Sequence, residues 1–123
     1  VYQYVTPSIT GILTVGLMAD KFEAYASSRN VDIEAVFWNL PWNIENVANY
    51  IKSGLSIDSP VLLVTWNTGI SGLAWHWVTI TRYHRTTAGD RYFTTSNHAS
   101  KRVYNLDVWV NESGLYRGVI YFD

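Results

Sequence analysis

Two residues near the middle of the chain could take part together in acid–base chemistry. His76 stands between two tryptophans at the beginning of an extended run, Trp75 to Tyr83. Imidazole titrates near neutral pH, and many hydrolases hold a histidine at the start of a half-buried strand as a general base. Asn97 ends the next extended run. Its side-chain amide can orient an imidazole, so the pair predicts a base and its positioning residue.

The spacing of these two runs allows the pair to meet. A hairpin that turns around Thr87 to Asp90 pairs residues whose numbers sum to about 175, which brings position 97 near positions 76 to 78. Each residue also has a plainer interpretation. His76 fits a structural histidine that is hydrogen-bonded inside an aromatic core, and Asn97 fits a turn residue. The juxtaposition is therefore a prediction for the structure to test.

The nucleophile that such a pair would serve is missing, because the sequence contains no cysteine. Ser8 and Thr10 lie at the start of the first expected helix, where the helix dipole favours an anion, but both residue types are also common structural N-caps. A metal site built from the three histidines, His76, His84 and His98, is not expected. His76 and His84 on one strand lie about 27 Å apart at about 3.4 Å per residue. We expect neither a metal nor another cofactor.

The composition is typical of a globular protein and gives no indication of a polyanionic partner such as nucleic acid. The 123 residues are 48% hydrophobic and 15% aromatic, with a formal net charge of −1. No run of Lys or Arg indicates nucleic-acid or anionic-membrane binding, and no apolar run approaches the roughly twenty residues of a membrane helix. The sequence begins at Val1, which we expect to be an internal residue of a longer protein. The absence of cysteine suits a secreted or cell-surface bacterial protein, which we expect, but it also suits many cytosolic proteins.

Periodicity predicts an α+β domain, residues 1–123, with two helices followed by a mostly antiparallel sheet of four to five strands. The first helix is expected over 9–28 with a stop at Asn30, and the second after Asn43, with Gly54 near its end. A helical turn is expected over 105–109. Trp38, Trp42 and Trp66 could fill the core or line a groove for peptide or sugar. The expected strands are 31–38, 60–66, 75–84, 91–96, 102–104 and 114–122.

Three segments together resemble a known family: Pro60 to Val64, Trp75 to Tyr83 and Phe93 to Asn97. They resemble the carboxy-terminal part of papain-like cysteine peptidases of the C39-like group, over roughly residues 42 to 122. The resemblance implies hydrolysis of a peptide or protein substrate by a thiolate. It also implies that His76 is the base, that Asn97 orients it, and that Trp75 and Trp77 wall the cleft.

The sequence departs from that family at the nucleophile. The family's Cys begins an earlier helix and follows a Gln, whereas the only Gln here, Gln3, lacks the expected motif. We therefore expect the carboxy-terminal portion of a larger papain-like domain, with the Cys on an amino-terminal segment or separate chain. An inactive relative that binds peptide or protein is the alternative. An unrelated aromatic-rich α+β domain with His76 in its core is the third possibility.

Overall fold

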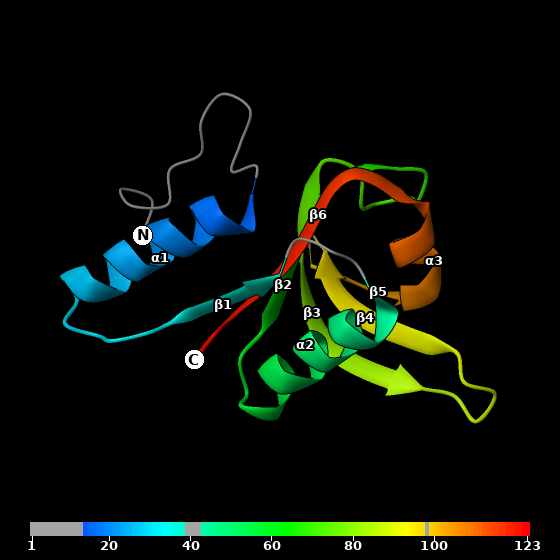
Figure 1. Cartoon of the computed structure of the whole chain (residues 1–123), viewed down its shortest axis with the longest axis horizontal. Coiled ribbons are helices and arrows are strands. Elements are labelled where there is room, and N and C mark those ends of the chain that lie inside the picture. The colour runs from blue at the N-terminus through cyan, green and yellow to red at the C-terminus, as the bar shows by residue number, and fades with distance from the viewer. Residues whose placement is uncertain (1–13, 39–42, 98) are drawn as a thin grey trace.

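The computed structural model describes residues 14–38, 43–97 and 99–123, which form an α+β fold (Figure 1). These residues make three helices and six strands. The sequence predicted two helices, a short strand between them, a helical turn over 105–109 and a block of four to five strands. None of the described helices is long and apolar enough to span a membrane. The order is α1 (Val15–Ser28), β1 (Ala35–Trp38), α2 (Ile44–Ser56), β2 (Val61–Thr68), β3 (His76–Arg85), β4 (Arg91–Asn97), β5 (Ser100–Asn105), α3 (Leu106–Glu112) and β6 (Ser113–Phe122).

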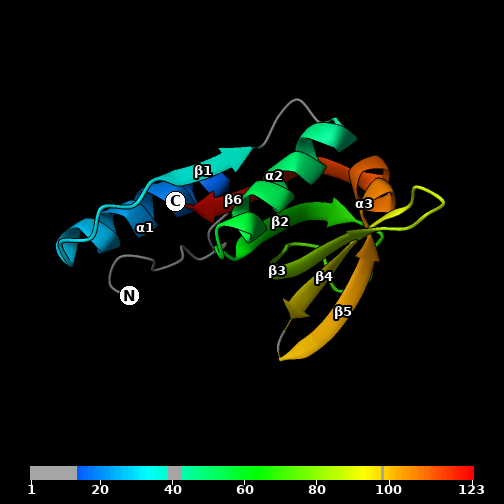
Figure 2. The ribbon, with the colours of Figure 1, turned by 90° about the horizontal axis from the view of Figure 1, so that it is seen from below.

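All six strands belong to one sheet, in the order β1-β6-β2-β3-β4-β5, and each neighbouring pair is antiparallel. The hairpin-spaced strands β2 to β5 lie side by side in sequence order, as short connections favour. The last strand, β6, instead inserts between β1 and β2 (Figure 2). The two edge strands lie at the expected segments 31–38 and 102–104: β1 pairs with β6, and β5 pairs along its whole length with β4.

The two faces of the sheet carry separate hydrophobic clusters. On β2, Val61 and Leu63 belong to a cluster with α2 and α3, whereas Leu62 and Val64 belong to a cluster with α1. This division follows from the alternation of side chains along a strand. Because both faces are covered, β2 is a nearly continuous apolar run. Figure 1 shows α1 and α3 at opposite ends of the molecule, with α2 between them.

Polar side chains set the helix starts. The Thr14 side chain accepts a hydrogen bond from Leu17 N, and the Asn43 side chain accepts from two backbone N–H groups at the start of α2. The Asn105 Oδ1 atom accepts from Val108 N at 3.0 Å in the same way. Asn30 follows α1 in the left-handed region, at φ 58°, as its type predicts. The caps of α2 and α3 were both expected from the sequence.

One expected boundary was wrong and another was confirmed. The first helix begins at Val15, with Thr14 as its N-cap, rather than at Ile9, and residues 9–13 lie outside the described part of the chain. Gly54 lies near the end of α2, as expected, because the helix ends at Ser56. A Cβ atom at Gly54 would lie 2.6 Å from Val61 Cγ2 and 2.8 Å from the ring of Tyr121. The glycine therefore allows α2 to pack closely on the sheet.

One arginine side chain connects helices α2 and α3 to the sheet. Arg91, at the start of β4, forms ion pairs with Glu45 of α2 and with Asp107 of α3, the latter at 3.2 Å. Its side chain is only 11% exposed. Such a partly buried, doubly paired guanidinium fixes geometry more than it adds stability. It therefore connects the first turns of both helices to the start of β4.

Candidate functional site

His76 and Asn97 lie in hydrogen-bond contact. The His76 Nε2 atom is 2.8 Å from the Asn97 Oδ1 atom, with Asn97 9% exposed and His76 half-buried. The Asn97 Nδ2 atom donates to the carbonyl of Gly72 at 3.0 Å. A carbonyl can only accept, so the amide oxygen must face the imidazole, and Nε2 must carry the proton that it donates. The neutral ring then has Nδ1 as its basic nitrogen.

A β-bulge puts the two side chains on one face of the sheet. Near the hairpin turn Arg82 pairs with Thr94, but beyond the extra residue Thr81 the register shifts, and Ile80 pairs with Thr95. On β4, Asn97 shares a face with Thr95, and on β3, His76 shares a face with Ile80. Without the bulge the parity would be reversed, and the two side chains would project from opposite faces. The predicted pairing near positions 76 to 78 is therefore confirmed.

The loop between β2 and β3 holds the amide in place. Gly72 has a φ of +86°, which favours glycine, and a Cβ atom there would lie 2.6 Å from Arg102 Nη1. The Tyr104 hydroxyl donates to the Ser71 carbonyl at 3.2 Å, and Arg102 Nη1 donates to the same atom at 3.4 Å. These contacts from β5 anchor the loop, so that Asn97 bonds to a fixed carbonyl. The sequence analysis missed this role, although a glycine in the loop was its signal.

Trp75 has an unusual backbone conformation directly before the histidine. Its φ is +53°, a genuine outlier for a bulky side chain, and strain of this kind often accompanies functional sites. Its backbone N–H donates to the Trp66 carbonyl at 2.7 Å, and its ring stacks on the Trp66 ring with centroids 5.5 Å apart. The Trp75 side chain remains 61% exposed. It is an open aromatic surface next to the imidazole.

The aromatic surface continues from Trp75 to α1. The Trp66 ring packs on the Tyr116 ring with centroids 5.1 Å apart, and the Tyr116 hydroxyl accepts a hydrogen bond from Val15 N at 3.0 Å. Trp66 therefore packs in the core and also supports the exposed indole of Trp75. It thus combines the two roles that the sequence left open, in the core and at a groove. Trp38 belongs to β1, and Trp42 lies outside the described residues.

A second polar contact lies on β2, the strand that pairs with the strand of the histidine. Thr65 is the ladder partner of both His76 and Arg117. Its Oγ1 atom accepts from Trp109 Nε1 at 2.8 Å, and both residues are 0% exposed. Burial lowers the pKa of the Arg117 guanidinium from its usual value. The indole of Trp109 thus occupies the space over the strand between His76 and Arg117.

A small open cavity adjoins the histidine and the asparagine, which we call the His76–Asn97 dyad. Its volume is about 270 Å³, and its lining comprises Gly72, Ala74, Trp75 and the dyad. We call it the Trp75 cavity. Trp77, which was expected to wall the same cleft, does not line it. Trp77 projects toward α1, because side chains alternate along β3.

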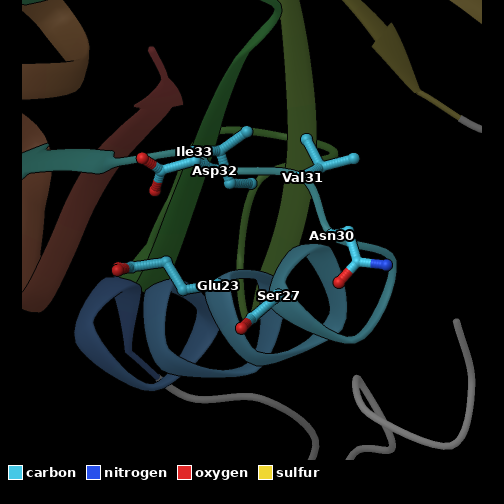
Figure 3. A pocket seen from close by; sticks show the side chains of 6 residues that line it. All are labelled: Glu23, Ser27, Asn30, Val31, Asp32 and Ile33. Atoms are coloured by element: carbon cyan, nitrogen blue, oxygen red, sulfur yellow. The ribbon is translucent and has the colours of Figure 1, made fainter.

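Another cavity lies away from the dyad, between α1 and the segment that leads to β1. It measures about 460 Å³ and is lined by Glu23, Ser27, Asn30, Val31, Asp32 and Ile33 (Figure 3). In Figure 3, Glu23 and Ser27 come from α1, whereas Asn30 and Asp32 come from the segment that leads to β1. The described residues contain no group of three or more potential metal ligands. This notch offers no arrangement suited to acid–base or metal chemistry.

One other histidine of the sequence analysis lies away from the dyad. His84 stacks on Tyr92, with ring centroids 5.3 Å apart, toward the far end of β3. Ser8, Thr10 and His98 lie outside the described residues.

Comparison with known proteins adds no family to this description. No protein-family model, no curated protein and no solved structure matches the chain.

Proposed function

We propose that the chain is the carboxy-terminal portion of a papain-like cysteine peptidase domain of the C39-like kind, with its nucleophilic Cys outside this sequence. The substrate is a peptide or protein, and the reaction is thiol-dependent acyl transfer. His76 is the catalytic base and Asn97 is its positioning residue. The observation that carries the proposal is the 2.8 Å contact between His76 Nε2 and Asn97 Oδ1.

The chemistry follows from which imidazole nitrogen is engaged. Nδ1 of His76 takes the proton of the Cys thiol, and the sulfur attacks the peptide carbonyl carbon. The C–N bond then breaks, and the imidazolium returns its proton to the leaving amine. A water molecule hydrolyses the thioester with His76 again acting as base, which regenerates the thiol. General acid–base catalysis of this type contributes about 10²–10⁴-fold in rate.

The position of the dyad supports this role over a purely structural one. His76 and Asn97 line an open cavity rather than a closed core, and the strained, exposed Trp75 stands beside them. A core histidine needs neither solvent access nor an exposed indole. The bond to a loop-anchored amide keeps the ring in one orientation, as a base must be kept.

The test begins with the coding sequence upstream of the Val1 codon. A Gln followed by Cys-Gly at a predicted helix start favours the enzyme. The longer chain should then hydrolyse peptides, and His76→Ala should lower kcat/KM by about 10²–10⁴-fold. Asn97→Ala should cause a smaller loss, and His84→Ala, on the same strand, should leave kcat/KM unchanged. Turnover by the isolated 123 residues, abolished by His76→Ala, would refute the proposed nucleophile.

A catalytically inactive module that binds peptide or protein is the second candidate. It is favoured by one observation: the sequence contains no cysteine, yet the dyad and the exposed Trp75 are both present. An upstream sequence without the Gln and Cys motif would support this function. The module should then bind peptides without hydrolysing them, and His76→Ala should have no more effect on binding than other substitutions in the Trp75 cavity.

A further inference from the structure

An arginine side chain lies close to the dyad. Arg102 of β5 is exposed, and its Nη1 atom donates to the Ser71 carbonyl at 3.4 Å. A Cβ atom at Gly72 would lie 2.6 Å from the same Nη1 atom and 3.4 Å from Asn97 Nδ2. The guanidinium and the amide of the dyad therefore flank one glycine, and that glycine lines the Trp75 cavity.

The charge of Arg102 has no counter-charge in the described part of the chain. The two ion pairs found there both belong to Arg91. The loop that joins β2 and β3, residues 69–75, contains no charged residue, and β5 contains Lys101 and Arg102 but no acidic residue. The edge of the Trp75 cavity at Gly72 therefore lies next to a positive charge that no carboxylate neutralises.

The guanidinium retains hydrogen-bond donors for a ligand. It carries five N–H groups in a planar fork, and this fork matches the two oxygens of a carboxylate. The bond to the Ser71 carbonyl uses one of these donors. The Tyr104 hydroxyl donates to the same carbonyl at 3.2 Å, so it can hold the loop by itself. Arg102 can therefore bind a ligand while Tyr104 keeps the loop in place.

We propose that Arg102 is a specificity-determining residue, and that the dyad binds peptides that carry a carboxylate. The carboxylate comes from an acidic side chain or from a peptide C-terminus, and it lies against Arg102. The neighbouring part of the peptide lies in the Trp75 cavity against the exposed indole. This inference rests on the proposed function, because it names the substrate class of the same site. It concerns binding only and involves no chemical step.

Four matched peptides test the inference by isothermal titration calorimetry on the 123-residue chain. Three are acetyl-Ala-X-Ala amides in which X is Glu, Gln or Lys, and the fourth is the Gln peptide with a free C-terminal carboxylate. The Glu amide or the free-carboxylate peptide should bind about fivefold more tightly than the Gln amide, as an exposed ion pair allows. Whichever of the two binds more tightly identifies the source of the carboxylate. The Lys amide should bind more weakly than the Gln amide, and added NaCl should reduce all these differences.

Substitutions at Arg102 assign the preference to this residue. Arg102→Gln removes the charge but keeps a donor for the Ser71 carbonyl, so it should bind all four peptides as the unsubstituted chain binds the Gln amide. Arg102→Lys keeps the charge and should retain most of the preference for a carboxylate. Arg85→Gln removes an exposed charge at the opposite end of β3 from His76 and should retain all of it.

Three results would overturn the inference. The first is equal binding of the four peptides by the unsubstituted chain. The second is a carboxylate preference that persists in Arg102→Gln. The third is weaker binding of the Gln amide by Arg102→Gln, because Arg102 would then act by holding the loop rather than by contacting the ligand.

The outcome is separable from that of the proposed function. A carboxylate preference in binding, with no hydrolysis by the longer chain, would retain the role of Arg102 and reject the peptidase. Hydrolysis by the longer chain with equal kcat/KM for the Glu and Gln amides and for the free-carboxylate peptide would retain the peptidase and reject the role of Arg102.

Discussion

Trp75 and Trp77 flank His76 in the sequence, yet they line different cavities on either side of it. The left-handed φ of Trp75 turns its exposed ring onto Trp66, while Trp77 follows the strand alternation and packs under α1. The two indoles therefore lie in different surroundings, an open surface for Trp75 and the hydrophobic cluster under α1 for Trp77. Substitutions at the two tryptophans should have separate consequences.

Trp75 should matter more for ligand binding than for stability. Because its side chain is 61% exposed, Trp75→Asn, which tolerates the left-handed conformation, should change the free energy of unfolding by less than about 1 kcal/mol. Urea denaturation measures this change. The same variant should weaken peptide binding at the dyad at least several-fold, as measured by isothermal titration calorimetry. A large loss of stability would show that the ring is structural.

Asn97 should control which nitrogen of His76 carries the proton. In the unsubstituted protein with a neutral imidazole, ¹⁵N chemical shifts should report the proton on Nε2 rather than on Nδ1, because Oδ1 accepts from Nε2. Asn97→Ala removes that acceptor and should mix the two tautomers. Asn67→Ala, at an exposed position on β2, is the matched control. Identical shifts in Asn97→Ala and the unsubstituted protein would contradict the assignment.

Thr65 and Trp109 should be energetically coupled. Thr65→Val keeps the shape of the side chain but removes the acceptor of the buried indole N–H, which should cost about 1–3 kcal/mol. In a Trp109→Phe background the same substitution should cost at least about 1 kcal/mol less, because that N–H is absent. A double-mutant cycle on urea unfolding measures the difference. Additive effects would show that this hydrogen bond contributes nothing.

Gly54 and Gly16, the two helical glycines among the described residues, should respond oppositely to substitution by alanine. Gly54→Ala introduces a methyl group 2.6 Å from Val61 Cγ2, and the resulting overpacking should destabilise the fold by about 1–3 kcal/mol despite the better helix propensity. At Gly16 the nearest atom to a new Cβ is 4.0 Å away, so Gly16→Ala should be neutral or stabilising by up to about 1 kcal/mol. Thermal unfolding of both variants provides the comparison.

Tyr50 should make stability fall at alkaline pH. Burial, and then the charge of Tyr121, raise the pKa of Tyr50 above its usual 10.0, and its hydroxyl donates to the Phe37 carbonyl at 3.2 Å. The folded-state pKa exceeds the unfolded-state value. The stabilisation is therefore complete below pH 10.0 and is lost as pH rises through the folded-state pKa. Tyr50→Phe should flatten this part of the curve of unfolding free energy against pH. Parallel curves for the two proteins would contradict the prediction.

Local sequence signals predicted most of the elements that position the site. The alternation of apolar and polar residues marks a strand wherever one face is buried, and the side chains of Asn43 and Asn105 cap helices through contacts only two or three residues away. The hairpin between β3 and β4 could be placed because its turn is short. For the same reason the approach of Asn97 to His76 was predictable to within a few residues.

Other features depend on contacts between distant segments. Gly54 suggests a helix end when only its neighbours are considered, but its role is set by Val61 and Tyr121 across the packed interface. The insertion of β6 between β1 and β2, and the cavity beside the dyad, likewise arise only when the layers pack.

By itself, the sequence determined an α+β chain with a histidine and an amide on adjacent strands, because strand period, caps and turn length are local properties. Only the tertiary structure decided that both side chains project from the same face. A single extra residue at Thr81 reverses the parity of the pairing, and its position is set by how the whole sheet packs rather than by any local preference.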